Sequence, residues 1–153
     1  MSITKLSAPD LTQRPPRSPR TRLGGYVLLS RMLDKGRATL AGTNGEYNYD
    51  SRSTSTSLVS SALTQKKLLA ELKEGKDAGK MLGWIQANAK HQQTPWKIQQ
   101  WSAYHDRRGP DSDAETLVFF AEYVAKLSKT REDIKTWADA LDLDDHVTFG
   151  GKA

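Results

Sequence analysis

"TPWKIQQWSAYHDRRGPDSDAETLVFFAEYVAKL" (residues 94–127) contains two helix patterns and the break between them. It opens with a Thr-Pro pair, which is typical of a helix start. The first N–H of a helix has no intrahelical acceptor, so a proline, which has no N–H, costs no hydrogen bond at that position. The Gly-Pro pair at Gly109 ends this helix. Ser112 with Glu115 then predicts the start of the next helix as a capping box. Two helices this close together favour an all-α fold.

Start and stop signals in the rest of the chain predict four further helices. These helices run from Thr21 to about Leu40, from Thr64 to Glu74, from Asp77 through Ile85, and from Thr130 through Leu141. With about six helices and little sheet, the sequence predicts a single compact all-α domain.

The segments outside these helices are short. Residues 1–19 contain four of the six prolines, so we expect an extended N-terminal arm followed by a helical domain over residues 20–153. Asn44-Gly45 favours positive φ and predicts a short hairpin or turn near residues 42–50. We expect the tail "HVTFGGKA" to be extended.

The composition excludes several classes of function. The chain has 153 residues and no cysteine, which excludes disulfides, thiolate nucleophiles and cysteine-bound metals. It has no run of about 18 apolar residues and no apolar signal segment, so we expect a cytoplasmic protein without a membrane partner. Because it has no nucleophile elbow and no phosphate-binding glycine motif, we predict neither catalytic residues nor a cofactor.

Histidines and carboxylates give only weak metal signals. The three histidines are 14 and 41 residues apart, not at the four-residue spacing that places two imidazoles on one helical face. "DLDDH" (residues 142–146) offers carboxylates, but as a calcium loop it has Val147 in place of the required glycine and Ala153 in place of the glutamate. We therefore predict no metal site and interpret this stretch as a solvated acidic helix end.

The excess positive charge is concentrated near the N-terminus. Residues 1–40 hold eight basic and two acidic side chains, a net of +6, whereas the rest of the chain holds fifteen basic and sixteen acidic, a net of −1. Guanidinium groups bind phosphates through paired hydrogen bonds. We therefore predict a non-enzymatic module that binds RNA, a ribonucleoprotein or a phosphorylated metabolite. The predicted anion-binding residues are Arg17, Arg20, Arg22, Arg31, Lys35 and Arg37.

A second set of side chains could line a pocket or stack on a base of a bound nucleic acid. It consists of Tyr26, Glu46, Tyr47, Tyr49, Trp101 and Tyr104.

Three other interpretations remain open. The arginines could pair with the eighteen carboxylates of the chain itself and strap the arm to its domain. The protein could be a small enzyme acting on an anionic substrate, with Glu46, its neighbouring tyrosines or Asp50 as acid/base groups. It could also be a helical protein–protein adaptor with an exposed patch that includes Trp96 and Trp101. A pocket containing Glu46 and an arginine favours the enzyme, and a flat basic face favours the binding module.

Five stretches of the sequence carry a resemblance to a known family: "LTQRPPRSPRTRLGGYVLLSRMLDKGRATLAG", "GEYNYD", "TPWKIQQWSAY", "PDSDAET" and "REDIKTWADALDLDD". Together they resemble a bacterial family catalogued as domain of unknown function 5069. The resemblance covers nearly the whole chain and implies a small, mainly helical cytoplasmic protein with no assigned catalytic residue or cofactor. The chain departs from the family pattern at Ser51 to Thr54, where a cysteine, a proline, a leucine and an aspartate are expected.

Overall fold

The regular structure of the described chain is helical throughout. A computed structural model describes residues 8–49, 65–89, 93–110 and 113–153. Within these ranges it contains no β-strand, which confirms the all-α prediction. The helices are α1 (Leu29–Ala41), α3 (Gln65–Lys73), α4 (Ala78–Asn88), α5 (Pro95–Arg107), α6 (Ala114–Leu127) and α7 (Trp137–Thr148).

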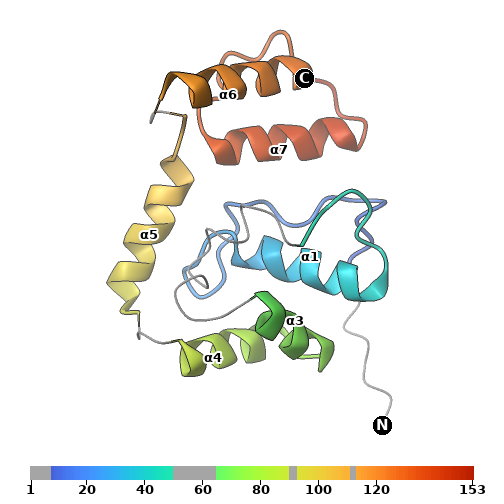
Figure 1. Cartoon of the computed structure of the whole chain (residues 1–153), viewed down its shortest axis with the longest axis vertical. Helices are drawn as coiled ribbons and strands as arrows, with labels where there is room; N and C mark the ends of the chain where they lie inside the picture. The colour runs from blue at the N-terminus through green and yellow to red at the C-terminus, as the bar shows by residue number, and fades with distance from the viewer. Residues whose placement is uncertain (1–7, 50–64, 90–92, 111–112) are drawn as a thin grey trace.

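Two groups of helices enclose separate apolar clusters. Figure 1 shows α6 and α7 side by side at one end of the molecule, α1, α3 and α4 at the other, and α5 along one side between them. The larger cluster joins α1, α3, α4 and α5, and its members include Leu33, Leu68, Met81 and Ile98. The smaller cluster joins α6 to α7 and the loop before it, through Phe120, Ile134, Ala140 and Leu143. The N-terminal arm, here defined as residues 8–28, runs between α1 and α7 (Figure 1).

Local capping residues set several helix ends as predicted. Asp77 accepts a hydrogen bond from the Lys80 backbone N–H at 2.8 Å and starts α4. Thr94 accepts from the Lys97 backbone N–H at 3.3 Å and starts α5, with proline at its first position. After α3, Gly75 has a φ of +81°, which stops a right-handed helix. The predicted cap of α3, Thr64, lies outside the described residues.

The predicted helix start at Thr21 is wrong, because α1 begins only at Leu29. Gly24, Gly25 and Leu28 have φ values of +58°, +84° and +69°, which a right-handed helix excludes. The positive φ favours glycine at position 24, and a Cβ there would lie 2.5 Å from the Leu82 side chain of α4, which would have to shift. The irregular arm therefore continues to Leu28, and the domain division at residue 19 stays a prediction.

The predicted start of α7 is also wrong. Thr136, not Thr130, caps this helix: its hydroxyl accepts from the Asp139 N–H at 3.1 Å, and the Asp139 carboxylate accepts from the Thr136 N–H at 3.0 Å. The helix continues to Thr148, so the first three residues of the predicted extended tail are helical. A capping box six residues further along the chain accounts for the error.

Asp113 caps α6 by accepting a hydrogen bond from the Thr116 backbone N–H at 2.7 Å. Ser112, the predicted cap, lies outside the described residues.

The length and polarity of these helices bear on the prediction that the protein has no membrane partner. Across the described ranges, every helix is too short or too polar to cross a bilayer.

The segment after α1 forms the predicted turn. The Tyr47 N–H donates to the Asn44 carbonyl at 2.9 Å, and Gly45 has a φ of +54°. Residues 42–49 contain no strand, so the turn is present without a hairpin ladder. The departure from the family pattern at Ser51 to Thr54 lies outside the described residues.

Candidate functional site

The arginines of the N-terminal arm bind carboxylates of the helices on either side. The Arg17 Nε–H donates to Asp34 of α1 at 2.9 Å, and the Arg17 backbone N–H donates to the same carboxylate at 2.9 Å. Arg20 donates to Asp142 of α7 at 2.9 Å and also pairs with Asp139. The hydrogen bond to Asp139 raises the pKa of Arg20. These contacts strap the arm to both helix groups.

A buried network lies behind the arm. Two Arg31 N–H groups donate to the two Asp145 oxygens at 2.7 and 3.1 Å, and both side chains are at most one-tenth exposed. The Tyr47 hydroxyl donates to the same carboxylate at 2.8 Å, and the Arg31 guanidinium lies 5.7 Å from the centre of the Tyr47 ring. Burial and this hydrogen bond raise the pKa of Tyr47, so its hydroxyl remains a donor.

The other predicted anion-binding residues are also held by the chain. Arg22 pairs with Asp106 of α5 at 2.9 Å. Arg37 donates to the Lys76 carbonyl at 3.3 Å. Lys35 is buried, and burial together with the charge of Arg31 lowers its pKa to about 8. The six residues thus contact the chain itself, and an anion-binding role for them stays a prediction.

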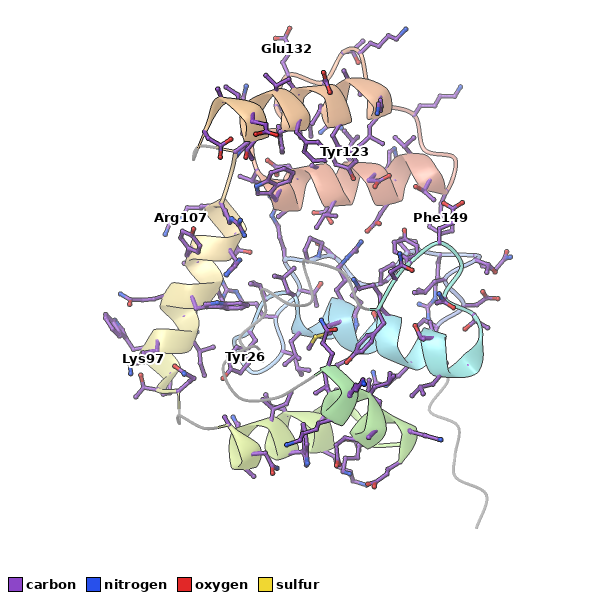
Figure 2. All side chains as sticks on the ribbon, viewed as in Figure 1. Tyr26, Lys97, Arg107, Tyr123, Glu132 and Phe149 are labelled. Atoms are coloured by element: carbon purple, nitrogen blue, oxygen red, sulfur yellow. The ribbon has the colours of Figure 1, made fainter. Side chains whose placement is uncertain are left out.

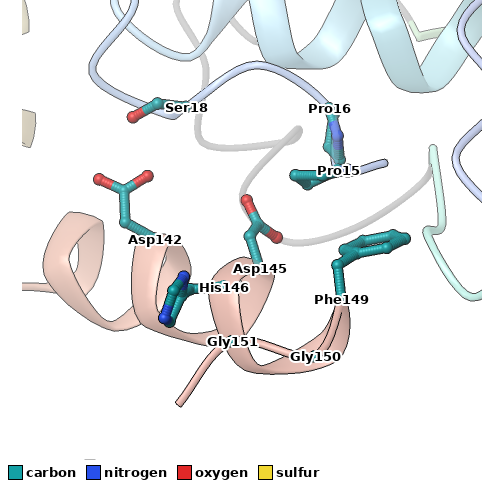
Figure 3. A pocket seen from close by; sticks show the side chains of 9 residues that line it. All are labelled: Pro15, Pro16, Ser18, Asp142, Asp145, His146, Phe149, Gly150 and Gly151. Carbon is teal, nitrogen blue, oxygen red and sulfur yellow. The ribbon is translucent and has the colours of Figure 1, made fainter. Parts of the chain in front are cut away.

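An open cleft of about 600 Å³ lies between the arm and α7 (Figure 3). Its carboxylates already have partners, because Asp142 binds Arg20 and Asp145 binds Arg31. Glu46 is exposed on its turn and does not line this cleft. The cleft is therefore not the pocket of Glu46 and an arginine that would favour the enzyme interpretation. It is lined by Pro15, Pro16, Ser18, Asp142, Asp145, His146, Phe149, Gly150 and Gly151.

The predicted aromatic residues divide by exposure. Tyr26 and Tyr49 are buried in the larger apolar cluster, and the Tyr49 hydroxyl donates to the Gln65 carbonyl at 3.0 Å. Trp101 is half-buried, with its ring edge-on to Tyr26 at a centroid distance of 6.4 Å. Tyr104 differs from these three because 62% of it is exposed. Of these four aromatic residues, Tyr104 is the one free to stack on a ligand.

The outward side of α5 groups Tyr104 with residues outside the predicted binding set. Trp96 is 66% exposed, and Lys97 and Arg107 are exposed at opposite ends of the same helix (Figure 2). The inward side is fixed by Ser102, whose hydroxyl donates to the Gly25 carbonyl at 2.7 Å and accepts from the Val27 N–H at 3.2 Å. We call Trp96, Lys97, Gln100, Tyr104 and Arg107 the outer face of α5. Its spacing of three and four residues was visible in the sequence.

Comparison with known proteins identifies the family of the chain. The family model described as "Domain of unknown function (DUF5069)" matches residues 13–147. The chain belongs to the DUF5069 family. No curated protein gives a significant match to this DUF5069 sequence. The matched range includes both the arm arginines and the outer face of α5. Because the family description names no activity, the function has to be argued from the geometry.

Proposed function

We propose that this DUF5069 protein is a non-enzymatic module that binds single-stranded RNA in the bacterial cytoplasm through the outer face of α5. The observation that carries the proposal is the exposure of two aromatic rings on one side of one helix. Trp96 is 66% exposed and Tyr104 is 62% exposed. Eight residues of helix separate them by about 12 Å along the helix axis.

Exposed aromatic rings suit single-stranded nucleic acid because every base has a π-face. Stacking of a base on an aromatic side chain contributes about 1–3 kcal/mol and tolerates different sequences. Lys97 lies beside Trp96, and Arg107 lies three residues beyond Tyr104, so each ring has a cation nearby for the phosphate of a stacked nucleotide. Small ligands bind in concave sites, whereas this surface is the convex side of a helix, which favours a polymer over a phosphorylated metabolite.

The charge around α5 also favours an anion. Arg22 pairs with Asp106, the single acidic residue of α5, and so compensates its negative charge. The outer face itself carries Lys97 and Arg107 and no acidic residue, a net charge of +2. Burial lowers the pKa of His105, which reduces the positive charge that this side chain carries at neutral pH. A phosphate backbone therefore meets an excess of positive charge on this side of the molecule.

The arm arginines are a weaker site for the same ligand. An RNA phosphate would have to displace Asp34 from Arg17, or Asp139 and Asp142 from Arg20. Such an exchange replaces one charge-assisted hydrogen bond by another and leaves a carboxylate without its partner. On the outer face of α5, a phosphate that binds Arg107 would displace no carboxylate, because the Arg107 Nε–H donates to the Ala103 carbonyl within its own helix.

The proposal is tested by fluorescence anisotropy with a labelled single-stranded RNA. Replacing both rings, W96A/Y104A, should weaken binding by at least about tenfold, since each stacking interaction contributes about 1–3 kcal/mol. The pair W96F/Y104F keeps two π-faces and should retain most of the affinity. The pair W96L/Y104L keeps apolar bulk without aromatic character and should lose affinity like the alanine pair.

Phe119→Ala is the matched control, because Phe119 is an aromatic residue of α6 that is 59% exposed. It should leave RNA affinity unchanged. Unaltered binding by W96A/Y104A contradicts the proposal. Absence of RNA binding by the unmodified protein also contradicts the proposal. In that case the exposed rings favour the protein–protein adaptor interpretation, since Trp, Tyr and Arg are enriched at protein interfaces.

A further inference from the structure

Helix α6 carries apolar side chains on two opposite sides. On the inner side, Phe120 is 6% exposed and packs edge-on against the Trp137 ring at a centroid distance of 4.9 Å. On the outer side, Leu117 and Val118 are 55% and 56% exposed. Exposed apolar side chains on the side opposite the buried one are not explained by the core of the chain itself, so the outer side has the character of a contact surface. This outer stripe consists of Ala114, Leu117, Val118, Ala121 and Ala125.

We propose that the outer stripe of α6 binds the same stripe of a second copy of this chain, with the two helices antiparallel. The residues recur at intervals of three and four, which is the spacing of a helix–helix seam. Three of the five are alanines, which allow two helices to approach closely, while Leu117 and Val118 supply apolar bulk. A two-fold symmetric contact needs a self-complementary surface. The stripe of one copy can contact the same stripe of the other copy, because each stripe lies on a single helix.

The charges beside the stripe favour the second copy as its occupant. At 100° per residue, Glu115, Glu122 and Lys126 follow one edge of the stripe, and all three are exposed. In an antiparallel pair, like edges of the two helices meet. A two-fold axis beside Ala121 therefore places Lys126 of each copy within about one helical turn of Glu115 of the other. The pairing occurs twice, once on each side of the axis, and outweighs the one like-charge contact, between the two Glu122 side chains near the axis.

The parallel arrangement lacks this complementarity. It brings opposite edges together and so places the charged edge of one copy beside Leu117 and Val124 of the other. Charged groups set against apolar side chains lose hydration without gaining a partner. The pattern of charges thus selects the antiparallel orientation as well as the partner.

Sedimentation of the full chain over a range of protein concentrations tests the proposal. We expect the mass to rise from the 17.0 kDa of one chain towards that of two chains as concentration increases. Leu117→Glu should weaken the association by at least about tenfold, equivalent to 1.4 kcal/mol. E115K and K126E should each weaken it, because each creates a like-charge contact between copies. The double variant E115K/K126E should restore it.

Lys80→Glu provides the control, since it makes the same change in net charge as K126E at an exposed position on α4. It should associate like the unmodified chain. Circular dichroism of each variant confirms that α6 is still folded, and a variant with reduced helix content is replaced by Val118→Glu. A chain that stays at the mass of one copy at about 1 mM overturns the proposal. A double variant as weak as the single variants overturns the antiparallel pairing. Neither result depends on RNA binding.

Discussion

The N-terminal arm and the outer face of α5 both carry basic side chains, but they use them differently. In the arm, Arg17 and Arg20 bind carboxylates of α1 and α7. On α5, Lys97 and Arg107 lie beside two aromatic rings that are mostly exposed. The density of positive charge along the sequence therefore does not locate an anion site. What the neighbouring elements place around each cation determines its role.

The same contrast separates stability from binding. Ion pairs of the arm join segments far apart in sequence, since Arg20 and Asp139 are 119 residues apart, and so hold the two helix groups to the arm. The residues of the outer face lie within one helix and contribute little to the contact between the groups. The arm network is defined here as the ion pairs of Arg17, Arg20 and Arg31 with their carboxylates, together with Tyr47 and Lys35. We therefore expect substitutions in the arm network to change folding stability and substitutions on α5 to change ligand affinity.

The largest expected effect is on stability, at the centre of the arm network. Asp145→Ala leaves the Arg31 guanidinium buried without its carboxylate, and removal of one partner of a buried ion pair typically costs about 3–5 kcal/mol. The free energy of unfolding, measured by urea denaturation, should fall by an amount in this range. Asp142→Ala, three residues away on the same helix, removes the partially exposed partner of Arg20 and should cost about 0–1 kcal/mol. Equal decreases for the two variants would contradict the network as described.

A smaller effect is expected from the pH dependence of stability. Burial and the charge of Arg31 lower the pKa of Lys35 from 10.5 to about 8. Between pH 8 and 10 the unfolded chain therefore binds more protons at Lys35 than the folded chain, so the free energy of unfolding should rise with pH, by about 2 kcal/mol. Above pH 10, Tyr47 and Tyr123 act in the opposite direction, because burial raises the pKa of both.

Two lysine substitutions, one in the arm network and one on α5, test whether Lys35 causes the pH dependence of the free energy of unfolding. Lys35→Met should remove the rise between pH 8 and 10, whereas Lys97→Met, on the exposed outer face of α5, should leave it intact. The measurement is a series of urea denaturation curves at fixed ionic strength. A pH dependence that survives in Lys35→Met shows that another group is responsible.

Local signals in the sequence predicted much of the fold. Asp77 and Thr94 start helices through hydrogen bonds that span three residues, so their effect can be read from the sequence alone. The start of α1 could not be predicted in this way, because Leu28 adopts a positive φ that few non-glycine residues adopt. The start of α7 was missed for a different reason: two capping patterns, at Thr130 and at Thr136, stand six residues apart, and the second forms the capping box.

The candidate site was less predictable than the fold. The sequence contains eighteen carboxylates, and nothing in it indicates which of them meet the arm arginines. The interpretation of residues 142–146 as a solvated helix end was wrong, since Asp145 is buried against Arg31 and lies inside α7. Trp96 and Tyr104, by contrast, share a helix face that a helical projection of α5 reveals. The charge asymmetry drew attention to the arm instead.

Two double variants, each lacking two positive charges in one region, decide whether RNA binds at the arm or at α5. The salt dependence of single-stranded RNA affinity is measured for K97A/R107A and for R17A/R20A, which change the net charge equally. We expect K97A/R107A to lower the slope of log affinity against log salt by about 0.7 for each phosphate that is no longer neutralised, and R17A/R20A to leave the slope unchanged. A reduced slope for the arm variant, with an unchanged slope for the α5 variant, would place the anion site in the arm and contradict the proposed role of α5.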